Sequence, residues 1–187
     1  MEETRTAPAD GAGTPTRVGA QVRRLREDRG LSQSALARAA GIGKASLSEL
    51  EAGRRNATLA TLYALAEPLG VPLAALLDEA IGAEVSGSGV TARLVDVGHR
   101  PEATVETYVM NFAAGELRRS PSHGAGVREH LVVVAGTLRI GPDAAPVEVR
   151  AGEHATFDAD VPHHYLALGG ENAQGVLVIV TPRLTRS

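Results

Sequence analysis

Residues 31–56 read LSQSALARAAGIGKASLSELEAGRRN. Two short helices that meet at about 90–120° through a tight turn need particular residues at fixed places, and this segment supplies them. Ala37 is small enough for the point where the helices cross. Gly41 tolerates the positive φ that ends the first helix. Leu47 can anchor the second helix on a core, so the segment predicts two packed helices joined by a tight turn.

Apolar residues continue at spacings of three and four from Thr16 to Leu77, which indicates further helices around this pair. Helix starts are expected after Ser32 and Thr58, whose hydroxyls can cap a first turn, and Pro72 suits the first turn of a last helix. Residues 17–77 are therefore predicted to form about five short helices. This span carries a net charge of +4, whereas the whole chain carries −3. A basic module on an acidic chain indicates a polyanionic partner.

These features resemble the Cro/C1-type helix-turn-helix domain of phage repressors and of the xenobiotic-response-element regulators. The resemblance covers residues 16–77 and implies double-stranded DNA as a partner. By motif position, the resemblance implies that Gln33 contacts phosphate, that Lys44 can reach guanine and that Glu49 can accept from cytosine. The residues after the second helix are expected to contact the DNA backbone. The predicted DNA-binding residues are Gln33, Lys44, Ala45, Ser46, Ser48, Glu49, Arg54, Arg55 and Asn56.

One module of this kind buries only about 600–1,000 Å² on DNA, which is too little for strong specificity. We therefore expect a homodimer on a palindromic operator, with half-sites about 34 Å apart. The alternative is a helical interaction module whose charged face is simply solvated.

The rest of the chain differs in composition. Residues 1–16 are rich in Ala, Pro, Gly and Thr and are predicted to be a disordered tail, and residues 78–89, which end in SGSG, are predicted to be a flexible linker. Over residues 90–183, short runs rich in Val, Thr and Leu alternate with turn residues, which is typical of a β-sandwich or barrel. The predicted fold class is α + β in two domains. The expected strands are 91–97, 104–112, 129–134, 137–140, 147–149, 155–157, 163–168 and 176–180.

This second domain resembles a cupin, a small double-stranded β-barrel. In the first cupin motif, His123, Glu129 and Gly136 fall into register, but Ala125 stands where a second histidine is expected. In the second motif His163 persists. The resemblance therefore implies the cupin fold with part of the cupin ligand set.

Strand alternation gives the direction of these side chains. If Glu129 faces the barrel interior, His130 faces outward, and His163 shares one face with Tyr165. The candidate effector-binding residues are therefore His123, Glu129, His163 and Tyr165. Two imidazoles and one carboxylate suit Zn, Fe, Mn or Ni, which makes His123, Glu129 and His163 the candidate ligands of one divalent transition metal.

Other interpretations remain open because Ala125 replaces one expected ligand. The two histidines can instead bind an organic anion directly, or only hydrogen-bond within the barrel. Arg118 and Arg119 are either solvated or, at the barrel mouth, able to bind a carboxylate.

Three functions fit these patterns. The favoured one is a transcription regulator, not an enzyme, whose barrel senses a small-molecule effector. The alternatives are a metal-dependent dioxygenase or isomerase fused to a DNA-binding domain, and a barrel used only for dimerisation. The absence of cysteine excludes disulfides, thiolate metal sites and thiol redox sensing. No segment resembles a signal peptide or a membrane span, so we expect a cytoplasmic protein with no membrane partner.

Overall fold

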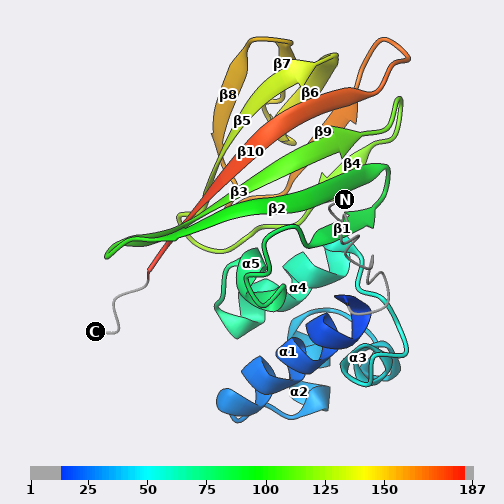
Figure 1. Ribbon diagram of the computed structural model, residues 1–187, viewed down its shortest axis with the longest axis vertical. Helices are drawn as coiled ribbons and strands as arrows, with labels where there is room; N and C mark the ends of the chain where they lie inside the picture. The colour runs from blue at the N-terminus through cyan, green and yellow to red at the C-terminus, as the bar shows by residue number, and fades with distance from the viewer. Residues whose placement is uncertain (1–13, 184–187) are drawn as a thin grey trace, which may run out of the picture.

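The computed structural model describes residues 14–183, in which helices come first and strands follow (Figure 1). The five helices are α1 (Thr14–Asp28), α2 (Gln33–Ala39), α3 (Lys44–Glu51), α4 (Leu59–Leu69) and α5 (Leu73–Leu76). The ten strands of the described chain are β1 (Glu84–Gly87), β2 (Val90–His99), β3 (Ala103–Phe112), β4 (Arg118–Ser120), β5 (Arg128–Ala135), β6 (Thr137–Pro142), β7 (Val147–Arg150), β8 (His154–Asp158), β9 (His163–Ala167) and β10 (Ala173–Pro182). None of the described helices is long and apolar enough to cross a membrane.

The helix pair α2 and α3 forms as the sequence predicts, and most of the residues singled out in the sequence have the expected roles. The Ser32 hydroxyl accepts a hydrogen bond from the Ala35 backbone N–H at the start of α2, which is the predicted cap. Gly41 has a φ of 64°, as the turn between α2 and α3 requires. Ala37 and Leu47 are buried in the core. Pro72 lies one residue earlier than predicted, at the N-cap of α5 rather than within its first turn.

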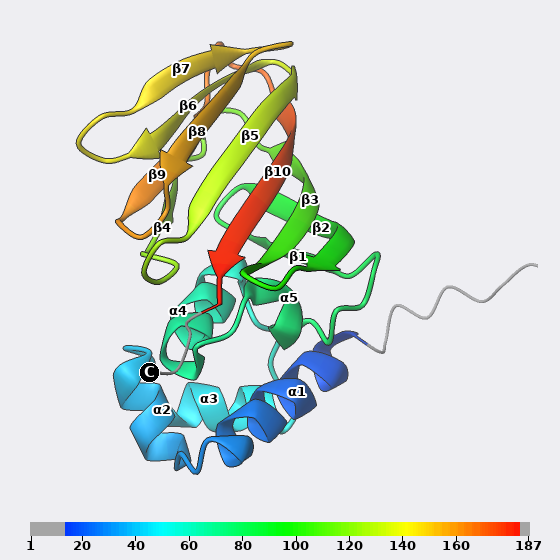
Figure 2. The same ribbon diagram turned by 90° about the vertical axis from the view of Figure 1, so that its left-hand side faces the viewer.

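The strands form two antiparallel sheets that face each other in a cupin-like barrel (Figure 2). The larger sheet has the order β1-β2-β3-β10-β5-β8, and the smaller one has the order β4-β9-β6-β7. Burial alternates along β5 and β9 as predicted, with Glu129, His163 and Tyr165 inside. The fold class, α + β with five helices and a barrel, is confirmed.

The prediction of a flexible linker over residues 78–89 is wrong at its C-terminal end. Residues 84–87 form β1, which pairs with β2 in the register Glu84↔Arg93 to Gly87↔Val90. Ser88 and Gly89 have φ values of 50° and 71°, and two successive residues with positive φ make the two-residue turn that suits the twist of a hairpin. The first half of SGSG therefore ends β1, and its second half, Ser88 and Gly89, is a hairpin turn.

Two short segments also differ from the sequence-based prediction, or lie partly outside the described residues. Most of the predicted tail, residues 1–13, lies outside the described residues, and residues 14–16 begin α1. The strand β4 was not expected, because its three residues are Arg118, Arg119 and Ser120 and carry no apolar pattern.

Helices α4 and α5 lie between the barrel and the other three helices (Figures 1 and 2). The backbone N–H of Ala74 in α5 donates a hydrogen bond to the buried carboxylate of Glu106 in β3. From α1, the Gln21 amide donates a hydrogen bond to the Ala75 carbonyl of the same helix at 2.7 Å. The buried apolar side chains of both domains belong to one continuous core, so the two domains are packed together.

Candidate functional sites

The candidate DNA-binding surface is formed by α3 and the residues that follow it. Ser46 and Ser48 are half-buried there, and the Arg55 guanidinium donates to the Ser46 hydroxyl at 3.3 Å. Arg55 also lies 4.0 Å from the Glu49 carboxylate. These contacts bring the end of α3 and the following turn onto one basic surface. The exposed predicted residues are Lys44, Ala45, Glu49, Arg54, Arg55 and Asn56.

Gln33 has a structural partner that the sequence did not reveal. Its side-chain amide donates to Glu51 at 2.8 Å. Glu51 is buried and forms a two-pronged ion pair with Arg26, with nitrogen–oxygen distances of 2.7 and 2.9 Å. A third nitrogen of Arg26 donates to the Leu31 carbonyl. This network joins α1, α2 and α3, and thereby fixes the angle at which α3 is presented.

The barrel brings together the three residues predicted as metal ligands. One ligand atom from each of His123, Glu129 and His163 lies within 4.8 Å of the other two. His123 Nε2 is 3.0 Å from Glu129 Oε1, and His163 Nε2 is 3.6 Å from the same oxygen. Tyr165 is buried beside them and its hydroxyl donates to the other oxygen of Glu129. The four residues predicted for the barrel site thus meet in one cluster.

The ligand atoms of this cluster are buried but not hydrogen-bonded. Both ring nitrogens of His123, Nε2 of His163 and Oε1 of Glu129 have no hydrogen-bond partner with suitable geometry. The Nδ1 atom of His163 lies 2.9 Å from the Val161 carbonyl, so it donates there and leaves a lone pair on Nε2. Buried polar atoms are normally paired, and a set of unpaired donor atoms that converge fits a divalent transition metal.

The charges of the cluster follow from burial and from mutual contact. Burial lowers the pKa of His123 and outweighs the opposing effect of Glu129. Burial also opposes protonation of His163, but the nearby Glu129 carboxylate outweighs it and raises the pKa of His163. Glu129 is itself buried, yet the two imidazoles hold its pKa below the ordinary range. The carboxylate is therefore ionised, as a metal ligand must be.

A residue of the helical domain reaches this cluster. The ring of Tyr63, in α4, stacks on the ring of His123 with 3.7 Å between centroids and 7° between planes. Tyr63 was not predicted as a site residue, although it is the only aromatic residue in 17–77. Its standing as the only aromatic residue of that range was the signal in the sequence that could have identified it. A cleft of about 750 Å³ between the α4–α5 turn and the barrel is lined by residues 66–72 and by His123.

Arg118 and Ser120 were also missed as interior residues. They alternate with the exposed Arg119 on β4, where they are 1% and 3% exposed. In the sheet register they stand opposite Tyr165 and His163. Of the two sequence-based options for Arg118, solvation does not apply.

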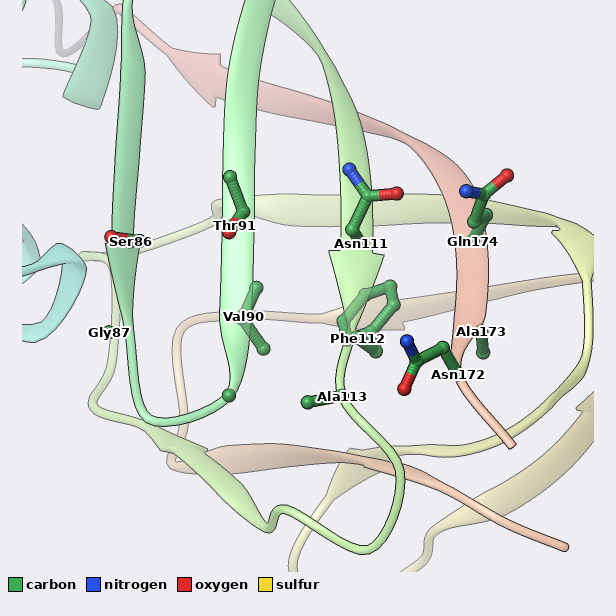
Figure 3. A pocket seen from close by; sticks show the side chains of 11 residues that line it. Ser86, Gly87, Val90, Thr91, Asn111, Phe112, Ala113, Asn172, Ala173 and Gln174 are labelled. Carbon is green, nitrogen blue, oxygen red and sulfur yellow. The ribbon is translucent and has the colours of Figure 1, made fainter. Parts of the chain in front are cut away.

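A second hollow, of about 510 Å³, lies along β1, β2, β3 and β10 away from the cluster (Figure 3). The side chains of Thr91, Asn111 and Gln174 lie side by side there, and Phe112 forms part of the lining. Its lining contains no charged side chain, and none of His123, Glu129, His163 and Tyr165 belongs to it. The titratable groups of the barrel therefore do not face this hollow.

A domain with two helices joined by a tight turn, packed on a cupin-like barrel, defines a two-domain class of protein. Residues 22–76 match the protein family described as Helix-turn-helix. Over 166 residues the chain is 31% identical to the HTH-type transcriptional regulator SutR of Escherichia coli (strain K12). This alignment covers 87% of this chain and 93% of that relative. The chain belongs to the family of HTH-type transcriptional regulators.

Two further comparisons agree with this assignment. An HTH_3 family transcriptional regulator from Vibrio cholerae has a crystal structure that superposes with a TM-score of 0.80 at 27% identity, covering 91% of this chain and 98% of that one. The immunity repressor protein of Bacillus phage phi105 is 36% identical over 62 residues, or 33% of this chain and 43% of that relative. The resemblance of the helical domain to Cro/C1-type regulators is confirmed, and the second domain has the predicted barrel of two facing sheets.

Proposed function

We propose that this transcription regulator binds double-stranded DNA as a homodimer through α3 and residues 54–56, and that its barrel senses a small-molecule effector. The observation that carries the sensing proposal is the stack of Tyr63 on His123. A ligand that binds at the barrel cluster meets a side chain of the helical domain directly. Its binding energy can therefore change the position of α4.

Movement of α4 would reach the DNA-binding surface through the packing of the helical domain. Leu59, Leu62 and Leu65 on α4 are buried in the core, and α4 packs against α2 and α1. The start of α4 follows Arg54, Arg55 and Asn56 within a few residues. Because packed cores are rigid, a shift of Tyr63 is transmitted to neighbouring helices rather than absorbed locally.

A second connection between the domains runs through α5. Glu106 of the barrel accepts from the Ala74 N–H, and the Ala75 carbonyl accepts from Gln21 of α1. Both contacts are direct hydrogen bonds to the backbone of one four-residue helix. The barrel and α1 are thus joined at two points, α4 and α5, and both would respond to a change inside the barrel.

We propose that His123, Glu129 and His163 hold a divalent transition metal. Their unpaired buried atoms fit that role. The metal, when bound, supplies a Lewis-acidic position for an oxygen or nitrogen of the effector. Tyr165 orients Glu129 by donating to its second oxygen, and the Val161 carbonyl orients the ring of His163.

The homodimer is supported by an apolar patch on the outer face of the larger sheet. Val132 and Val134 point outward from β5 and are 47% and 59% exposed. Val132 pairs with Val176 in the adjacent β10, which widens the patch. A two-fold dimer would cover this face and place two copies of α3 for a palindromic operator.

The experiment is a measurement of DNA affinity by fluorescence anisotropy, with an operator selected from a random DNA pool by the full chain. We compare protein stripped by a chelator with protein reloaded with Zn²⁺ or Mn²⁺. The wild type should change its Kd by at least about fivefold, which is the usual lower range of allosteric coupling. Tyr63→Leu should abolish the difference while retaining DNA binding.

His154→Ala serves as the matched control, because His154 is exposed on β8 and lies outside the cluster. It should respond to metal as the wild type does. Equal affinities of the stripped and reloaded wild type would overturn the coupling between barrel and DNA.

A further inference from the structure

The guanidinium of Arg118 is buried in the barrel without a counterion. Arg118 is 1% exposed, and its Nη2 atom has no hydrogen-bond partner. Within residues 14–183 no carboxylate forms an ion pair with it. The charge is permanent under ordinary conditions because an arginine side chain stays protonated even where burial lowers its pKa. Burying such a charge without a partner is costly, so the position calls for an anion.

The buried carboxylate of Glu129 is already engaged by other groups. Glu129 accepts from Tyr165 with one oxygen, and its other oxygen faces the two histidines. Glu129 attracts the Arg118 guanidinium electrostatically but forms no hydrogen bond with it. Among residues 14–183, Arg118 is therefore a buried cation without a hydrogen-bonded counterion.

Ser120 provides a second free donor on the same face. Its hydroxyl oxygen is buried and has no hydrogen-bond partner, and it lies two residues after Arg118 on β4. Arg118 is opposite Tyr165 and Ser120 is opposite His163 in the register with β9. The Arg118 guanidinium and the Ser120 hydroxyl, beside Tyr165 and His163, are thus two hydrogen-bond donors for which the described chain supplies no acceptor.

We propose that Arg118 and Ser120 bind the oxyanion group of the effector, a small organic carboxylate or phosphoryl compound. The planar guanidinium matches two oxygens of such a group, and the serine hydroxyl donates to one of them. The inference rests on the proposed function only in that the effector occupies the barrel. The cleft beside His123 is lined by two cations, Arg29 and Arg183, and one carboxylate, Glu67, and this excess of positive charge favours the approach of an anion.

The test is isothermal titration calorimetry of the full chain, without DNA, with oxalate and with inorganic phosphate as probes. Ethylene glycol is the uncharged control for oxalate. At least one anion should bind to the wild type and the glycol should not. Arg118→Met should weaken anion binding by at least about tenfold, and Ser120→Ala by a smaller factor.

Arg119→Met is the matched control on the same strand, since Arg119 is 68% exposed and pairs with Asp143. It should bind the anion as the wild type does. If Arg118→Met does not fold, Arg118→Lys, which keeps the charge but removes the fork, should bind more weakly than the wild type. Absence of anion binding in the wild type, or equal binding in the Arg118, Ser120 and Arg119 variants, overturns the proposal.

The outcomes separate this inference from the proposed sensing function. Anion binding that depends on Arg118 but leaves DNA affinity unchanged would support the anion site and contradict sensing. A DNA response to metal with no anion binding would contradict the anion site and leave sensing intact.

Discussion

The helical domain and the barrel both bury charged side chains, but they satisfy them differently. In the helical domain, Arg26 and Glu51 form a two-pronged pair that Gln33 completes. In the barrel, Arg118 has no counterion and the donor atoms of His123 and His163 that face Glu129 have no hydrogen-bond partner. A paired buried charge holds a fold together, whereas convergent unpaired groups indicate that something outside the chain completes them.

The largest effect is expected where the helical network is broken. Glu51→Ala should lower the free energy of unfolding by about 3–5 kcal/mol, because it leaves the Arg26 guanidinium buried and unpaired. Urea denaturation of the full chain measures this. The control is Arg23→Ala, which removes an exposed ion pair with Glu27 and should cost less than about 1 kcal/mol. Similar losses in the two variants would mean that the buried network is not structural.

The buried carboxylate of Glu106 at the domain interface should make the stability of the protein depend on pH. Burial is the main reason why the pKa of Glu106 rises from 4.5 to about 7, with Glu129 and Glu79 adding smaller effects. The folded state therefore holds a proton that the unfolded state releases, so stability falls as pH rises from 4.5 to 7 and the whole cost is present above 7.

Glu106→Gln should remove this cost while keeping an acceptor for the Ala74 N–H. At pH 8 it should stabilise the protein by up to about 3 kcal/mol, and at pH 4.5 by much less. Denaturation curves at the two pH values measure the difference, with the exposed Glu102→Gln as the control. A gain that is the same at both pH values would refute the assignment to Glu106 ionisation.

Polar side chains on the outer face of α3 should affect DNA binding and leave the fold unchanged. Replacing Lys44 and Ser48 with alanine should weaken operator binding by about 1–3 kcal/mol or more, with the unfolding free energy unchanged. Binding by the wild type should also weaken steeply with salt, because phosphate contacts release counterions. Anisotropy titrations at several salt concentrations measure both. Unchanged affinity would show that α3 is not the reading helix.

The smallest change in stability is expected at Arg118. In protein without an effector, Arg118→Met should leave the free energy of unfolding within about 1 kcal/mol or raise it, because it removes an uncompensated charge. This is the reverse of the result for Glu51→Ala. A loss of several kcal/mol would indicate that Arg118 is a structural residue, like Arg26.

Local signals in the sequence were sufficient for the helix pair. Ser32 as a cap, Gly41 at a positive φ and Leu47 in the core each depend on their immediate neighbours, and each was predicted. Alternation along β5 and β9 likewise placed Glu129, His163 and Tyr165 inside. The family resemblance added His123, which no periodicity could have supplied.

Features that depend on distant contacts were missed. Tyr63 meets His123 across the domain interface, at a separation in sequence that no local pattern spans. Arg118 was not placed inside the barrel, because an arginine on a three-residue polar strand does not look like an interior residue. The SGSG segment has the composition of a linker, and only the pairing of Ser86 and Gly87 with β2 shows that it ends a strand and forms a hairpin turn.

The most direct test of the central claim is elemental analysis of the full chain purified without chelator, together with His163→Ala. The claim is that the unpaired atoms of His123, Glu129 and His163 form a ligand site for a metal. It predicts about one equivalent of a transition metal per chain in the wild type and a loss of that metal in the variant. The absence of metal from both samples, with the wild type also taking up none when Zn²⁺ or Mn²⁺ is added, would contradict it.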